Sequence, residues 1–117
     1  MTPDESWLVV AATDDLEKDD VIEVTVKGQA IALYQTKDGY FATSGICTHQ
    51  FSRLCEGFVF GNIIECGKHQ GRFDVRTGAP KGAPAHVALK TYPVRIIDGQ
   101  IELDIGTIQE TFSAEKE

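Results

Sequence analysis

Two short segments of the chain each pair a cysteine with a histidine. Cys47-Thr48-His49 places the two side chains two residues apart, Cys66-Gly67-Lys68-His69 places them three apart, and sixteen residues separate His49 from Cys66. A loop can aim two such side chains at one point, whereas a strand sends neighbouring side chains to opposite faces. Thiolates and imidazoles bind transition metals, so two facing loops predict a four-ligand site of two sulfurs and two nitrogens.

The order of these ligands bears on the metal. Zinc sites that use both residue types commonly group cysteine with cysteine and histidine with histidine, because one ion takes all four ligands. Here each segment supplies one of each, which suits a two-iron cluster whose irons each draw one ligand type from both segments. A structural zinc site stays open as an alternative. A Cys/His nucleophile pair is disfavoured, because no third orienting group or oxyanion hole is evident.

Composition limits the classes of protein that the chain can represent. With 117 residues, 42% apolar and 25% charged, it resembles one globular domain. A net charge of −7 and a pI near 4.9 disfavour nucleic-acid and membrane-surface binding. No apolar run approaches the roughly 18–20 residues of a membrane span, and residues 1–6 are acidic, unlike a signal peptide. Three cysteines do not predict a disulfide scaffold, so we expect a cytoplasmic protein.

Apolar and polar residues alternate with a period of two through most of the chain, which predicts an all-β fold. The expected strands cover 22–26, 30–34, 40–42, 58–60, 63–65, 72–75, 94–97 and 101–105. Turn dipeptides separate several of them, among them Lys27-Gly28, Asp38-Gly39, Gly61-Asn62 and Asp98-Gly99. The acidic stretch 13–20 is expected to form a turn of helix or a solvated loop, and 106–117 a polar tail.

Charge divides the chain into three parts. Residues 1–44 carry nine acidic and three basic side chains, residues 45–86 three and five, and residues 87–117 six and three. The middle part is therefore the only one with a positive balance, and it holds all three cysteines. We expect a single domain over 1–117, with an antiparallel β-sandwich base from 1–44 and 87–117 and an inserted small β subdomain, 45–86, that binds the metal.

The spacing C-x-H, sixteen residues, C-x2-H is the Rieske [2Fe-2S] motif, and the chain resembles the small Rieske-type ferredoxins of bacterial aromatic-ring-hydroxylating dioxygenase systems. The resemblance covers nearly the whole chain, and its motifs are Ile46-Cys47-Thr48-His49, Leu54-Cys55-Glu56-Gly57, Ile64-Glu65-Cys66, His69-Gln70-Gly71-Arg72-Phe73-Asp74, Thr77-Gly78, Pro84-Ala85 and Thr91-Tyr92-Pro93-Val94. It implies a Rieske fold, one [2Fe-2S] cluster with Cys47 and Cys66 on the inner iron and His49 and His69 on the outer iron, and a covering proline-containing loop at 78–84.

The resemblance also indicates a low-potential member of the family. High-potential Rieske proteins carry an additional disulfide, and a serine and a tyrosine that donate to cluster sulfurs. The matching positions here are Ser52 and Lys68 for the disulfide, Gly71 for the serine and Phe73 for the tyrosine. Missing donors lower the potential, so we expect a value near the low end of the Rieske span of about −150 to +300 mV.

What the resemblance implies about function is electron transfer rather than catalysis. A one-electron carrier of this kind accepts electrons from an NAD(P)H-dependent ferredoxin reductase and delivers them to a terminal Rieske oxygenase. We expect a monomer that forms transient complexes through a docking face at His49, His69, Gln70, Lys81 and Pro84. The alternatives are a Rieske-like small subunit of an assimilatory nitrite reductase and, from another class, a structural zinc module.

Several residues have ordinary structural interpretations. Cys55 is expected to be a small buried or free thiol and His86 a surface residue. Trp7, Tyr34 and Phe41 are expected in the core.

Overall fold

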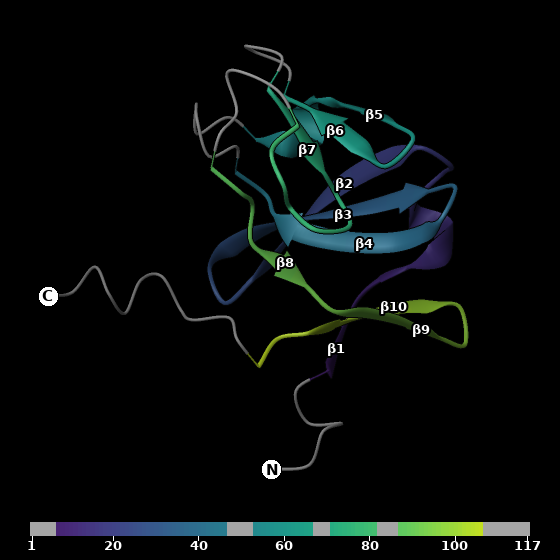
Figure 1. Cartoon of the computed structure of the whole chain (residues 1–117). Helices are drawn as coiled ribbons and strands as arrows, with labels where there is room; N and C mark the ends of the chain where they lie inside the picture. The colour runs from purple at the N-terminus through teal and green to yellow at the C-terminus, as the bar shows by residue number, and fades with distance from the viewer. Residues whose placement is uncertain (1–6, 47–52, 67–70, 82–86, 107–117) are drawn as a thin grey trace, which may run out of the picture.

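The protein is built almost entirely of antiparallel β-strands, arranged in three sheets (Figure 1). The computed structural model describes residues 7–46, 53–66, 71–81 and 87–106. In chain order the strands are β1 (Trp7–Ala12), β2 (Asp20–Val26), β3 (Gln29–Thr36), β4 (Gly39–Ser44), β5 (Phe58–Phe60), β6 (Ile63–Glu65), β7 (Arg72–Asp74), β8 (Thr91–Tyr92), β9 (Val94–Ile97) and β10 (Gln100–Asp104). Two single turns of 3-10 helix, η2 (Thr13–Asp15) and η3 (Leu54–Glu56), join them.

Two of the sheets form the base. One has the strand order β2-β3-β4-β8 and the other β1-β10-β9. In the second sheet β1, the first strand of the chain, pairs with β10, the last. Between them lies the base core, whose buried members are Leu16, Val26, Ile31, Leu33, Ala42, Tyr92, Ile101 and Leu103. Burying each of the larger aliphatic side chains contributes about 2 kcal/mol.

The third sheet, β5-β6-β7, lies above the first base sheet (Figure 1). The core beneath it, here called the Cys66 core, consists of Ala32, Tyr34, Leu54, Ile64, Cys66, Phe73, Val75 and Leu89. Strand β3 serves both cores, because Ile31 and Leu33 face the base core while Ala32 and Tyr34 face the Cys66 core. This explains why the sequence of β3 is a continuous apolar run rather than an alternating one.

The strands expected from alternation are confirmed, together with the all-β class. Ile22, Val24 and Val26 face the base core, as the period of two predicts. The turns also agree: Lys27-Gly28 and Asp98-Gly99 have positive φ at both residues, which matches the twist of two-residue hairpins.

Two strands were not anticipated. Strand β1 has no alternation to reveal it, and its pairing with β10 is interrupted by a bulge between Val9 and Ala11. Strand β8 is two residues long and is defined by its pairing with β4. In the acidic stretch, η2 is the expected turn of helix, and Leu16 behind it is buried.

The expectations for the aromatic residues hold in part. Tyr34 is fully buried and Phe41 packs against the Cys66 core. Trp7 belongs to neither core: it is partly exposed, and the Arg95 guanidinium carbon lies 4.4 Å from its ring centroid. Its position on an outer strand of a three-stranded sheet explains the difference. In the described residues no helix is long and apolar enough to cross a membrane.

Candidate metal centre

Cys66 is the one predicted ligand that the structure describes; Cys47, His49 and His69 lie outside the described residues. It directly follows β6 and has no exposed surface. Its side chain belongs to the Cys66 core with Leu54, Phe73 and Leu89. The backbone N–H of Cys66 donates to the Gly71 carbonyl oxygen at 2.7 Å, which extends the β6–β7 ladder by one bond and closes the base of segment 67–70. A strand end thus delivers this thiol into an apolar, water-free environment.

The described residues on either side of 47–52 are also joined to each other. Ile46 and Arg53 form a β-bridge, and the Leu54 N–H donates to the Gly45 carbonyl oxygen at 2.8 Å. Leu54 itself is fully buried in the Cys66 core. The chain that leads into Cys47 and His49 therefore starts and ends beside the same core that contains Cys66.

The segment 82–86 has two anchors as well. The Lys81 N–H donates to the Arg72 carbonyl oxygen at 2.7 Å, and the Leu89 N–H donates to the Gly78 carbonyl oxygen at 2.8 Å. Gly78 has φ +80°, and a Cβ at this position would lie 2.1 Å from the Leu89 oxygen. Only glycine allows this close approach. Lys81 is exposed, whereas Gln70, Pro84 and His86 lie outside the described residues.

An ion pair joins strands β6 and β7 next to the hydrogen bond between Cys66 and Gly71. Glu65 on β6 is opposite Arg72 on β7, and the Arg72 Nε donates to Glu65 Oε1 at 3.0 Å. The same guanidinium lies over the Phe60 ring of β5, with its central carbon 5.8 Å from the ring centroid. One arginine side chain thus contacts both other strands of the small sheet.

Glu23 connects the base to η3. Its side chain is only 16% exposed, and Oε1 lies 3.7 Å from both Arg53 Nε and Cys55 Sγ. Cys55 is a free, partly buried thiol, as expected. Burial, followed by the nearby Glu23 carboxylate, raises the pKa of Cys55. This thiol therefore stays protonated at neutral pH and donates to Glu23.

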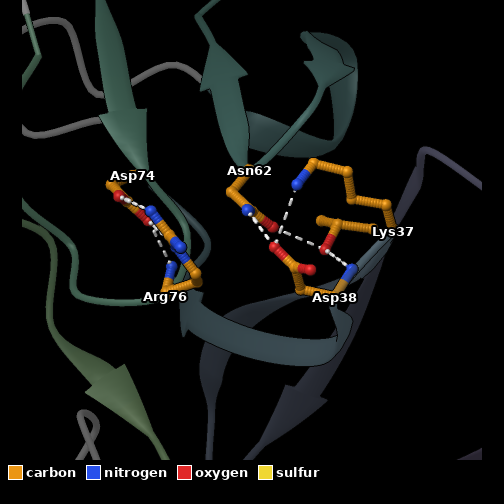
Figure 2. Close-up of polar contacts among 6 residues, drawn as sticks. Lys37, Asp38, Asn62, Asp74 and Arg76 are labelled. Atoms are coloured by element: carbon orange, nitrogen blue, oxygen red, sulfur yellow. Dashed lines mark hydrogen bonds and ion pairs between the residues drawn. The ribbon is translucent and has the colours of Figure 1, made fainter.

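A polar latch, formed by Thr36, Asp38 and Asn62, joins the small sheet to the base at the β5–β6 and β3–β4 turns (Figure 2). The Asn62 Nδ2 donates to Asp38 Oδ2, and its Oδ1 accepts from Thr36 Oγ1, both at 2.6 Å. The hydrogen bond from Asn62, and then that from Lys37, lowers the pKa of Asp38.

Beside the latch, Asp74 and Arg76 form a paired clamp at the end of β7 (Figure 2). Arg76 Nε and Nη2 donate to the two carboxylate oxygens at 3.1 and 2.9 Å, and the Asp74 side chain is only 7% exposed. These hydrogen bonds lower the pKa of Asp74. The clamp fixes the turn from which the chain continues to Gly78.

Sequence reasoning missed these supporting residues. Glu65 and Arg72 carried a signal, because opposite charges flank segment 66–71 symmetrically. Glu23 carried none, because its position in the alternation predicts a solvent-facing residue.

Comparison with known proteins defines the class of the chain. Residues 6–93 match the Rieske [2Fe-2S] domain family, so the chain belongs to that family. The family's cofactor is a Rieske-type [2Fe-2S] cluster.

Within that family the chain is similar to ferredoxins of aromatic dioxygenase systems. It is 42% identical to the ferredoxin component of the naphthalene 1,2-dioxygenase system of Pseudomonas aeruginosa, over 87% of this chain and 98% of that protein. It is 39% identical to the anthranilate 1,2-dioxygenase ferredoxin subunit of Burkholderia cepacia, over 86% and 93%.

Comparison with solved structures gives the same similarity to dioxygenase ferredoxins. A complex of reduced oxygenase and oxidized ferredoxin in carbazole 1,9a-dioxygenase contains a chain that matches with TM-score 0.80 and 34% identity, over 85% of this chain and 93% of that one. The Sphingomonas yanoikuyae B1 ferredoxin matches with TM-score 0.79 and 36% identity, over 83% and 96%. A putative nitrite reductase small subunit matches with TM-score 0.73 and 21% identity, which shows a shared fold alone.

The described residues fit such a cofactor. Cys66 has a fully buried side chain directly after a strand, and its thiol is free of any disulfide, so it is available as a metal ligand. The chemistry of the full donor set, two thiols and two imidazoles, suits the same group.

Proposed function

We propose that this chain is a one-electron carrier of a multicomponent aromatic-ring-hydroxylating dioxygenase, with a Rieske cluster held by Cys47, His49, Cys66 and His69. In this proposal it receives electrons in the cytoplasm from an NAD(P)H-dependent ferredoxin reductase and passes them to the terminal oxygenase. The observation that carries the proposal is the match to dioxygenase ferredoxins over nearly their whole length.

When bound, the cluster takes up and releases one electron at a time. The residues of the chain decide where this happens and how it is shielded. The Cys66 core keeps water from the sulfur of Cys66, since Leu54, Phe73 and Leu89 are buried with it. Exclusion of water on this side favours electron exchange on the opposite side, where we place His49 and His69. The subdomain 45–86 would act as the redox unit and the two base sheets as its support.

The side chains near Cys66 bear on the reduction potential. Phe73 is fully buried in the same core and has no hydroxyl group to donate to a sulfur, and Gly71 has no side chain. Fewer hydrogen bonds to the cluster leave its reduced state less stabilised. This supports the expectation of a potential near the low end of the Rieske span.

Docking to partners requires an exposed surface near the histidines. Lys81 is exposed and lies at the start of segment 82–86, consistent with a docking role for Gln70, Lys81 and Pro84. Transient partners need only a small contact area, and the positive balance of 45–86 can orient the encounter. The nitrite reductase alternative has weaker support, because those neighbours share the fold at only 20 and 21% identity.

The experiment is to assay iron and acid-labile sulfide on the purified protein and to record its EPR spectrum before and after dithionite. We expect equal iron and sulfide, silence when oxidised, and a rhombic signal after reduction with an average g below that of all-cysteine ferredoxins. Electron delivery is then measured as NAD(P)H-driven turnover of a dioxygenase with its reductase. A colourless protein containing zinc and no sulfide would instead support the structural zinc module.

A further inference from the structure

Arg72 occupies a position from which it can influence two of the three segments around the candidate metal centre. Its side chain crosses the small sheet, from β7 to Glu65 on β6 and to the Phe60 ring on β5. Its carbonyl oxygen accepts a hydrogen bond from Lys81, immediately before segment 82–86. Its neighbour Gly71 closes segment 67–70 through the bond to Cys66.

The Glu65–Arg72 pair brackets the ligand-bearing segment closely. Glu65 directly precedes Cys66, and Arg72 directly follows Gly71. The ion pair therefore joins the residue pair next to the one that the backbone hydrogen bond between Cys66 and Gly71 connects. The Glu65 side chain is 15% exposed, whereas Arg72 is 52% exposed. The planar guanidinium group directs its Nε at the carboxylate, while its central carbon lies over the Phe60 ring at a cation–π distance of 5.8 Å.

We propose that Arg72 is a positioning residue for the cluster, which holds the spacing of strands β6 and β7 and thereby the position of the candidate ligand Cys66. This inference rests on the ligand assignment of the proposed function. It assigns two effects to the residue. One is geometric, through the pair with Glu65 and the contact with Phe60. The other is electrostatic, because Arg72 balances a carboxylate next to a ligand.

The two effects have different signatures. Removing the positive charge leaves the Glu65 carboxylate unbalanced, so R72Q should lower the midpoint potential, while E65Q should raise it. The double variant E65Q/R72Q restores the charge balance, and its potential should return toward that of the wild type. The geometric effect should persist in the double variant as shifted g values of the reduced cluster, because the strand contact is still missing.

The base of the same molecule contains a matched control. In the sheet β1-β10-β9, Arg95 Nε donates to Glu102 Oε1 at 2.8 Å and the guanidinium lies over the Trp7 ring. Arginine, glutamate and aromatic ring come from one outer strand, the middle strand and the other outer strand, as in the small sheet. The β9–β10 connection is the turn at Asp98 and Gly99, without a candidate ligand.

The experiment compares R72Q, R72K, E65Q, E65Q/R72Q and R95Q, each with its cluster assembled, by redox titration and EPR of the reduced state. We expect changed g values and a lowered potential for R72Q, and wild-type values of both for R95Q. R72K retains the charge without the planar guanidinium group and its Nε donor, so it should recover the potential but not the g values.

Either of two results would overturn the inference: wild-type g values in both R72Q and R72K, or equal changes in R72Q and R95Q. If R72Q does not fold, E65Q is compared with E102Q, because each removes the carboxylate of one of the two pairs. Equal changes of the g values in these two variants would then overturn the inference. A wild-type protein without a reducible cluster would overturn the proposed function itself, before any variant is compared.

Discussion

Arg72 and Arg95 make the same kinds of contact in two three-stranded sheets, and the sheets differ in what their strand ends carry. Each arginine pairs with a glutamate on the middle strand and lies over an aromatic ring on the far strand. In the base, β9 leads into a tight turn, whereas β6 leads directly into Cys66. Similar local interactions therefore stabilise a hairpin in one region and support a candidate metal centre in the other.

The two cores also differ in whether they contain a candidate ligand. The base core is made of aliphatic side chains, one alanine and one tyrosine, and it holds no cysteine. The Cys66 core contains a fully buried thiol, and among its members are Leu54, Cys66 and Leu89, which lie in the chain close to the segments with predicted ligand or docking residues. The base core thus stabilises the fold, while the Cys66 core also determines where a candidate ligand is placed.

The largest difference is expected between the two described thiols. Cys66→Ser should abolish cluster binding, because it removes the proposed buried ligand, whereas Cys55→Ser should leave the iron content unchanged, because Cys55 contacts Glu23 instead. Iron and sulfide per chain and the EPR signal of the reduced protein measure both. Retention of a full cluster in Cys66→Ser would refute the ligand assignment.

The second difference concerns two glycines with positive φ. Gly78→Ala should destabilise the protein by about 3 kcal/mol or more, because its Cβ would meet the Leu89 carbonyl oxygen in addition to the backbone strain. Gly99→Ala should cost only about 1 kcal/mol, since the nearest atom to its Cβ is Thr13 Oγ1 at 4.0 Å. Chemical denaturation of both variants measures these free energies. Equal losses would mean that the close approach at Gly78 is unimportant.

The third difference is between high and low pH in the stability that the Asp74–Arg76 clamp contributes at the end of β7. Asp74→Asn should cost about 2 kcal/mol at pH 7, because it removes the charge that Arg76 binds while keeping an acceptor for the Arg76 N–H. The folded pKa of Asp74 is lowered, so its stabilisation is fully present above the unfolded pKa of about 3.9 and is lost as the pH falls through the lower folded value. Wild type and variant should therefore converge in acid. Urea denaturation from pH 7 down to about 3 tests this, and a constant difference across that range would contradict it.

The smallest effect is expected at Glu23. Glu23→Gln removes a carboxylate that raises the Cys55 pKa, so it should lower that pKa and speed alkylation by iodoacetamide at pH 8 by a few-fold. Burial is the larger cause and is unaffected, which limits the gain. Mass spectrometry of the labelled peptide gives the rate, with Glu56→Gln as a control for an exposed neighbour. An unchanged rate in Glu23→Gln would exclude a direct contact between Glu23 and the thiol in solution.

The sequence by itself determined the tight turns, the candidate ligands and all of the described strands except β1 and β8. Alternation reports which face of a strand is buried, and residues such as Asp98-Gly99 report backbone conformation, so both are local properties. The Cys/His spacing is local as well, and it sufficed to predict the family to which the chain belongs.

Only the tertiary structure decided how these elements support one another. Glu23 reads as a solvent-facing strand residue, yet packing of η3 against β2 buries it next to Arg53 and Cys55. Likewise, the sequence places Arg72 close to the predicted ligand His69, but only the pairing of β7 with β6 and the position of β5 bring its side chain to Glu65 and Phe60. These roles depend on contacts between residues distant in the chain, and a local pattern carries no information about which distant surface will cover it.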